Sequence, residues 1–206
     1  MSLSKQPFED RWSKYGGHSP ISLFFHHIHP ISQEAIARID AGTFPLHAAR
    51  GEMIFKPGSK GDRLYLILKG VVRGYIVEDG KEITTWINEE NEVIGTIRNL
   101  GLELPSEESI QAIENCELIG MPYELVEELY ATYPESNVVG RKVLEDSYRA
   151  AEERAYISRI PAAERRYKRL VETRPNLSNR IPLKYIASYL GITLETLSRI
   201  RNRRSI

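Results

Sequence analysis

The pattern of short apolar runs between Phe44 and about Met121 constrains the fold most. These runs are rich in β-formers and are separated by glycines, as in RLYLILKG and VVRGYIV. Spacing of this kind predicts an all-β barrel or roll. Between VVRGYIVE and KEITTWI, Asp79 and Gly80 predict a tight hairpin, because a two-residue turn that needs positive φ at both centres favours Asp-Gly. An antiparallel β-roll is therefore expected in the first part of the chain.

After Pro122 the pattern becomes helical, so the expected fold class is α+β. From Pro134 to Ile160 almost no helix breaker occurs, which predicts one long helix that ends before Pro161. Mostly small residues recur along it at alternating steps of four and three, a spacing that lets two helices approach closely. This predicts a dimer seam, and the alternative is a helix packed on its own β-roll. The seam residues are Leu144, Tyr148, Ala151, Ala155 and Ser158.

These patterns divide the chain into three parts. Residues 1–132 are expected to form the roll domain, 133–160 the dimerisation helix and 161–206 a compact C-terminal domain. Residues 20–40 are expected to be a loop that enters a short helix, with Ser32 as its N-cap. A helix is predicted over Ala162–Thr173, followed by the polar linker RPNLSNRIP.

Composition limits the class of protein. No apolar run approaches the roughly 20 residues of a membrane-spanning helix, and the polar start MSLSKQPFEDRWSKYGG lacks the apolar core of a signal peptide. A cytoplasmic protein is therefore expected. The single cysteine, Cys116, cannot form an internal disulfide or supply a four-thiolate iron–sulfur cluster, so a small core residue is expected there.

The charge of the chain is unevenly distributed. The net charge is zero, but residues 159–206 contain 12 Lys or Arg against three Glu, a net charge of +9, and residues 1–158 carry −9. This asymmetry favours a polyanion as partner of the C-terminal part. The alternative is a solvated basic face with no partner.

The segment LKYIASYLGITLETLSRI carries the clearest functional signal. Its apolar positions fit two short helices that share a small core and are interrupted at Gly191, which is the pattern of a helix-turn-helix. Ala187 is small where the helices would cross, Gly191 can adopt the left-handed conformation, and Thr193 can cap the second helix. The apolar positions are Leu183, Ile186, Leu190, Ile192, Leu197 and Ile200.

The outward face of the second helix is predicted to contact base edges in a major groove. A carboxylate accepts a hydrogen bond from cytosine N4 and a guanidinium donates two to guanine, so Glu195 and Arg199 are the expected base readers. The alternative is a salt bridge between these two residues within the helix. Arg201 and Arg204 add positive charge near the helix end. The expected DNA-binding residues are Thr193, Glu195, Thr196, Ser198, Arg199, Asn202 and Arg203.

With these residues the chain resembles the CRP/FNR family of bacterial transcription regulators, named for the cyclic AMP receptor and the fumarate-nitrate regulator. A glycine-punctuated roll from Gly51 to Gly95, a long helix and a terminal helix-turn-helix follow in the family's order over nearly the whole chain. The resemblance implies a regulator that binds a near-palindrome as a homodimer, with RNA polymerase as a further partner. The spacing of Glu195, Ser198 and Arg199 resembles the fumarate-nitrate branch and implies a half-site containing TTGA.

The expected ligand pocket departs from the pattern of members that bind cyclic AMP. In those members a Gly-Glu pair holds the ribose, and an Arg followed by Ser or Thr holds the phosphate. Here Thr96 follows Gly95, and Ser106 and Glu107 stand at the Arg and Ser positions. A carboxylate about 4 Å from a phosphate repels it by about 4 kcal/mol at an effective dielectric of about 20, so cyclic AMP is not the expected effector. Arg98 in the same loop could supply a charge, and another small-molecule effector is the alternative.

A second departure concerns the end of the sequence. Members of the family usually continue from the recognition helix into a β-hairpin wing, whereas this sequence ends at Ile206. A helix-turn-helix lacking most or all of the wing is therefore expected, with weaker or more cooperative DNA binding.

The sequence lacks the residues that two other protein classes need. His26, His27 and His29 invite a metal or haem, but no Cys, Asp or Glu accompanies them at ligand spacing, so no metal site is expected. A cupin-type enzyme needs histidines on the barrel strands, and none follows His47, so catalysis is not expected. The remaining alternative is a ligand-free roll that serves dimerisation or protein interaction.

Overall fold

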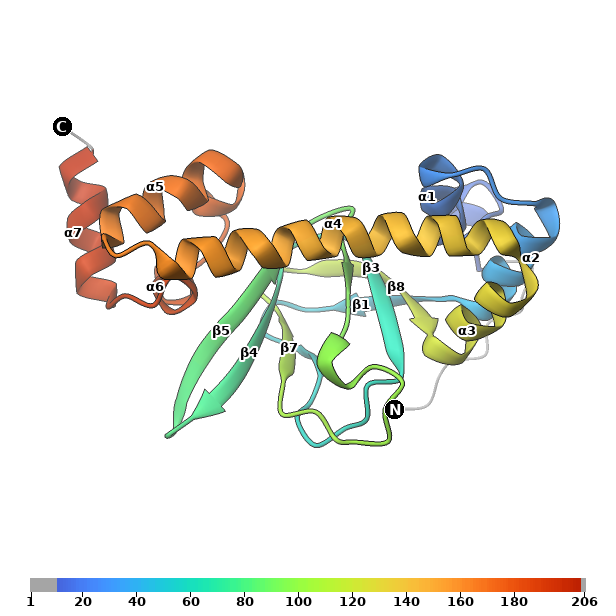
Figure 1. The fold of residues 1–206 in the computed structure, drawn as a ribbon, viewed down its shortest axis with the longest axis horizontal. Helices are drawn as coiled ribbons and strands as arrows, with labels where there is room; N and C mark the ends of the chain where they lie inside the picture. The colour runs from blue at the N-terminus through green and yellow to red at the C-terminus, as the bar shows by residue number, and fades with distance from the viewer. Residues whose placement is uncertain (1–10, 205–206) are drawn as a thin grey trace.

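A β-roll lies at the centre of the computed structural model, which describes residues 11–204 (Figure 1). Two antiparallel sheets of four strands form it, in the orders β1-β8-β3-β6 and β2-β7-β4-β5. This confirms the expected α+β class. The first sheet contains β1 (Phe44–Ala48), β8 (Cys116–Pro122), β3 (Arg63–Lys69) and β6 (Val93–Ile94). The second contains β2 (Met53–Phe55), β7 (Ser109–Ala112), β4 (Val72–Glu78) and β5 (Lys81–Asn88).

The predicted hairpin is confirmed between β4 and β5. Asp79 has φ of 49° and Gly80 has φ of 73°, the left-handed values that this turn requires. Residues from both sheets bury their side chains between them, among them Ile67, Ile110 and Cys116. Burial raises the pKa of the Cys116 thiol to about 11, so this residue behaves as the expected small core side chain.

Four helices flank the roll. They are α1 (Pro20–Ile28), α2 (Gln33–Gly42), α3 (Tyr123–Thr132) and α4 (Pro134–Arg159). The Ser32 hydroxyl accepts a hydrogen bond from the Ala35 N–H, which confirms the predicted N-cap of α2. The loop expected before it was wrong, because residues 20–28 form α1. Pro20 starts that helix, and Ile21 and Phe25 lie one turn apart on its apolar side.

Helix α4 is the predicted long helix and links the two ends of the molecule. It extends along the roll from the N-terminal helices to the C-terminal unit (Figure 1). That unit contains α5 (Ala163–Thr173), α6 (Leu183–Leu190) and α7 (Leu194–Arg204). Short 3-10 turns lie at Ser13–Tyr15, Ile97–Asn99 and Leu177–Asn179. No helix within residues 11–204 has the length and apolar character needed to cross a membrane.

The segment predicted as a polar linker is part of the packed structure. Leu177 is 1% exposed and Ile181 is 5% exposed, and both belong to the core of the C-terminal unit. The same cluster includes Val71 and Ile87 of the roll. The linker prediction was wrong because these two apolar residues, four apart, bury one side of an otherwise polar segment.

Candidate nucleic-acid interface and ligand hollow

Helices α6 and α7 have the local geometry of a helix-turn-helix. Gly191 ends α6 with φ of 63°, in the left-handed region that glycine adopts at low cost. The Thr196 N–H donates to the Thr193 hydroxyl over 3.2 Å, which is the predicted cap of α7. Ile186, Leu190 and Leu197 are at most 2% exposed and join the two helices.

The outward side of α7 is open to an external partner. Leu194, Glu195, Ser198, Arg199, Asn202 and Arg203 line a shallow open hollow on it. Hydrogen bonds from its own backbone N–H and from the Thr193 hydroxyl lower the pKa of Glu195, so its carboxylate is ionised. Within the described residues Glu195 and Arg199 form no ion pair with each other. The alternative prediction, a salt bridge between them within the helix, is therefore not seen.

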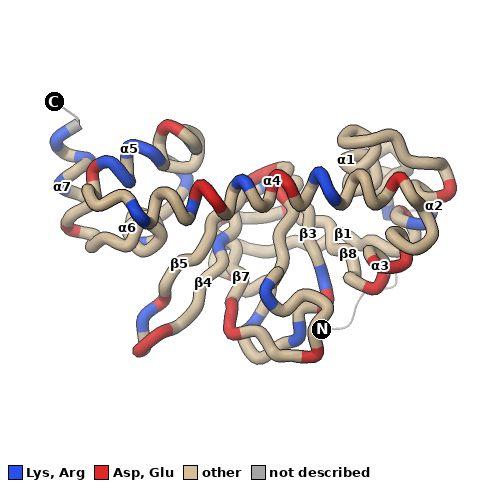
Figure 2. Tube along the Cα trace, viewed as in Figure 1, with Lys and Arg blue, Asp and Glu red and all other residues tan. Residues whose placement is uncertain are grey.

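Lys and Arg recur along the helices of the C-terminal unit (Figure 2), and some of them contact carboxylates of the roll. Arg180 donates to Glu90 over 2.6 and 2.9 Å and also contacts Glu114. Arg174 lies 2.7 Å from a carboxylate oxygen of Glu92. Part of the excess positive charge therefore serves contacts within the chain.

Helix α6 contacts strand β5 directly. The Ser188 hydroxyl accepts a hydrogen bond from the Thr84 N–H over 2.9 Å. Arg73, on β4, is 1% exposed, and its guanidinium lies 4.1 Å from the ring centre of Tyr75 and 3.7 Å from that of Tyr185. A buried cation between two aromatic rings joins the roll to α6.

The predicted seam lies on an uncovered side of α4. Leu144 is 60% exposed and Tyr148 is 66% exposed, while Ala151 and Ala155 are partly exposed. The β-roll of the same chain therefore leaves this side of α4 free. The alternative was that these residues pack on their own roll, but Leu144 and Tyr148 are exposed.

The expected ligand region contains a hollow of about 530 Å³ between β5, the loop before β7 and α4. Of the five predicted pocket residues, Arg98, Ser106 and Glu107 line it, but Gly95 and Thr96 do not. Thr96 is 2% exposed, and its hydroxyl has no hydrogen-bond partner within residues 11–204. The lining residues are Ile76, Thr85, Trp86, Arg98, Asn99, Leu104, Pro105, Ser106, Glu107, Glu108 and Arg154.

Glu108 was not among the predicted residues, although it is the more enclosed of the two carboxylates that line this hollow. Its Oε1 accepts hydrogen bonds from Trp86 Nε1 over 2.7 Å and from the Thr85 hydroxyl over 3.1 Å. Burial raises the pKa of Glu108, against the opposing effect of the Trp86 and Thr85 hydrogen bonds. Arg154 of α4 was also missed, because the residues predicted to be functional on that helix were those of the dimer seam.

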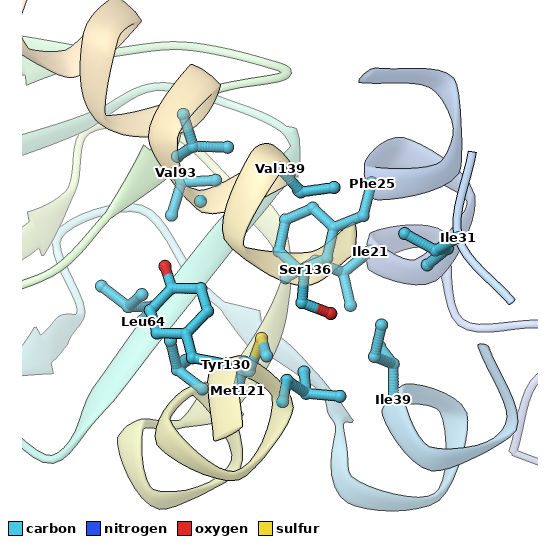
Figure 3. Close-up of a pocket in the computed structure, with 14 residues that line it drawn as sticks. Ile21, Phe25, Ile31, Ile39, Leu64, Val93, Met121, Tyr130, Ser136 and Val139 are labelled. Carbon is cyan, nitrogen blue, oxygen red and sulfur yellow. The ribbon is translucent and has the colours of Figure 1, made fainter. Parts of the chain in front are cut away.

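A second cavity, of about 50 Å³, lies between the N-terminal helices, α3 and the start of α4 (Figure 3). Its walls are apolar apart from Ser136 and the hydroxyl of Tyr130, and no charged residue lines it. This cavity therefore suits no charged ligand.

The histidine cluster lies on and after α1. His26 and His27 are exposed, and His26 Nδ1 accepts a hydrogen bond from the Ile31 N–H over 3.2 Å. Within the described residues no group of His, Cys, Asp and Glu is arranged to hold a metal ion.

Comparisons with known proteins agree on one family. Residues 45–133 match the model of the cyclic nucleotide-binding domain. The electron transport regulator A of Shewanella oneidensis is 28% identical, and the fumarate and nitrate reduction regulatory protein of Vibrio cholerae is 27% identical. Each alignment covers 75% of this chain and 66% of the relative, so the chain spans just under two thirds of these relatives' length.

Solved structures share the fold. A CRP/FNR-family regulator from Eubacterium rectale superposes with a TM-score of 0.68 at 15% identity, covering 88% of this chain and 87% of the other. FixK2 from Bradyrhizobium japonicum gives a TM-score of 0.64 at 18% identity, covering 78% and 83%.

Proposed function

Because this chain belongs to the CRP/FNR family of transcription regulators, we propose that it binds duplex DNA as a homodimer through α7. Its β-roll then acts as a sensor for a ligand other than cyclic AMP.

The open side of α7 carries this proposal. Glu195 and Arg199 are exposed and form no ion pair with each other in the described structure, and Ser198 lies between them on the same hollow. The major groove of B-DNA admits an α-helix, and a carboxylate and a guanidinium together complement cytosine N4 and the guanine edge. Thr193, Thr196, Asn202 and Arg203 flank them, and the proposal gives these four residues contacts to the DNA backbone and neighbouring bases.

The uncovered seam of α4 supports a dimer. Two copies that pack through Leu144, Tyr148, Ala151 and Ala155 bury apolar side chains that are exposed in a single chain. Their α7 helices would then enter major grooves about 34 Å apart on a near-palindromic site.

The hollow in the roll supports a sensor that excludes cyclic AMP. Glu107 and Glu108 both line it, and a carboxylate repels a phosphate at close range. Arg98 and Arg154 also line it, so the hollow carries both signs of charge.

Selection of binding sites from random duplex DNA tests the proposal, at two salt concentrations and without added ligand. We expect enrichment of an inverted repeat with TTGA-like halves, and weaker binding at the higher salt because phosphate contacts release counterions. The control protein is Arg50→Ala, which lacks an exposed arginine of the roll and should select the same sequence as the wild type. Enrichment of single half-sites would contradict the dimer, and a pool without any shared sequence would contradict the assignment of α7.

A further inference from the structure

Glu108 presents one free carboxylate oxygen to the hollow. Both of its described hydrogen bonds, from Trp86 and Thr85, go to Oε1. Within residues 11–204 no donor reaches Oε2, although Glu108 lines the hollow. A partly buried carboxylate oxygen without a donor is a strong acceptor for a ligand N–H group.

Two arginines approach the same hollow from other elements. Arg154 comes from α4 and Arg98 from the short turn after β6. In the described structure neither forms an ion pair with Glu108, although the charges of both lower the pKa of that carboxyl. Burial lowers the pKa of Arg154, as expected for a guanidinium that lacks a close carboxylate. The hollow is therefore lined by a carboxylate, Glu108, and by a guanidinium, Arg154, that are not paired with each other.

The remaining wall is apolar. Ile76, Trp86 and Leu104 contribute to it, and the hollow of about 530 Å³ falls in the usual range for small-molecule sites, about 300–1,000 Å³. An apolar body can rest on this wall while its polar ends reach the charged groups.

From this arrangement, and given that the roll is the sensor of the proposed function, we propose that the hollow binds a free amino acid with an apolar side chain. The ammonium group donates to Glu108 Oε2, the carboxylate lies against the guanidinium of Arg154 with Arg98 at the rim, and the side chain contacts Trp86.

The charges exclude simpler ligands. A ligand with only negative charge is repelled by the carboxylates of Glu107 and Glu108. A ligand with only positive charge is repelled by the guanidinium groups of Arg98 and Arg154. A molecule with both charges can place each beside its opposite.

The same residues connect the hollow to the DNA-binding unit. Arg154 also lines a small cavity with Leu170 and Tyr189 of that unit. Strand β5 presents Thr85 and Trp86 to the hollow, and its neighbouring Thr84 binds Ser188 of α6. Ligand binding at Arg154 and β5 therefore acts on the contact between roll and α6.

The test is thermal unfolding of the full chain in the presence of each of the common amino acids, with cyclic AMP as a comparison. We expect at least one apolar amino acid to raise Tm by about 5 °C at a hundredfold excess over its Kd, and cyclic AMP to give no rise. Absence of a rise with every amino acid overturns the proposal.

Variants locate the binding site. Glu108→Gln keeps an acceptor for Trp86 and Thr85 but loses the charge, and Arg154→Gln loses the guanidinium. Each should weaken amino acid binding, measured by titration calorimetry, at least about tenfold. Glu124→Gln on α3 and Arg50→Gln are the matched controls and should bind as the wild type does. Unchanged affinity in both hollow variants places the ligand elsewhere and overturns the proposal.

Measuring DNA binding on the same protein separates this inference from the proposed function. Sequence-specific DNA binding without any amino acid binding refutes the ligand alone. Amino acid binding at Glu108 and Arg154 without DNA binding refutes the DNA-binding function alone.

Discussion

The outward and inward sides of the C-terminal unit use arginine for different purposes. On the outward side, Arg199 and Arg203 line an open hollow and form no ion pair within the described residues. On the inward side, Arg174 and Arg180 bind carboxylates of the roll. The excess of positive charge in this unit thus combines a surface for DNA with a surface for the sensor domain, and net charge alone does not distinguish the two.

The two sides also differ in burial. Exposed ion pairs contribute about 0–1 kcal/mol each, whereas buried or bidentate pairs carry larger energies. Arg73 of β4, which contacts the inward side of α6 through Tyr185, is fully buried, while Arg199 on the outward side is exposed. Substitutions on the inward side should therefore change stability, and substitutions on the outward side should change DNA binding.

Arg73→Leu should give the largest effect. The change removes the cation between Tyr75 and Tyr185 and leaves Gln111, which accepts from Arg73 over 2.9 and 2.7 Å, without that donor. We expect the free energy of unfolding to fall by about 3 kcal/mol, measured by urea denaturation. Arg50→Leu on the exposed surface is the control and should change it little. A loss below about 1 kcal/mol would show that the inward contact is not a major source of stability.

Arg199→Ala and Arg203→Ala should separate two roles on the outward side. Loss of Arg199 should cost about 1–3 kcal/mol of discrimination at one base-pair position, because a bidentate contact to guanine is removed. Loss of Arg203 should weaken all sequences alike and reduce the salt slope by about 0.9, as for one phosphate contact. Fluorescence anisotropy on the selected site and its single-base variants measures both. Equal losses on every sequence for both variants would refute Arg199 as a base reader, and neither variant should lower Tm.

Arg180→Gln should make the inward contact less sensitive to acid. The hydrogen bond from Arg180 holds the pKa of Glu90 at about 2, below its ordinary value of 4.5. A lowered pKa in the folded state stabilises the fold fully above about pH 4.5, and this contribution disappears as the pH falls towards about 2. Because both side chains are partly exposed, we expect the wild type to exceed the variant by about 1.5 kcal/mol at neutral pH.

Urea denaturation at a series of pH values measures this difference between the wild type and Arg180→Gln. The difference should narrow steadily below about pH 4.5. A difference that is independent of pH would mean that Arg180 stabilises the contact by packing and not through the Glu90 carboxylate. Lys14→Gln, which removes an exposed ion pair with Glu117, is the matched control and should show a much smaller difference at neutral pH.

How far the sequence predicts each region depends on the separation of the residues involved. The hairpin at Asp79 and Gly80 and the turn at Gly191 were predicted because all their determinants lie within one short segment. Burial and exposure of the α7 positions followed from the same local periodicity.

The hollow and the inward contact depend on residues that the topology brings together. Trp86 and Glu108 are 22 positions apart, and Arg180 and Glu90 are 90 positions apart. No local sequence pattern predicts that Glu108, just before β7, and Arg154, on α4, line the same hollow. Of the five pocket residues predicted from the sequence, Arg98, Ser106 and Glu107 therefore line the hollow, whereas Gly95 and Thr96 do not.

Gly191→Ala should give the smallest effect, at the turn that joins the inward helix α6 to the outward helix α7. With φ of 63°, an alanine there costs about 1 kcal/mol, whereas asparagine tolerates the left-handed region better and should cost about half as much. The free energy of unfolding and the affinity for the selected site measure the effect on each side. An added Cβ would lie 3.4 Å from Arg166 Nη1, which donates to the Leu190 carbonyl over 2.8 Å. If Gly191→Asn destabilises as much as Gly191→Ala, this contact with Arg166, and not the backbone conformation, determines the orientation of α7 relative to α6.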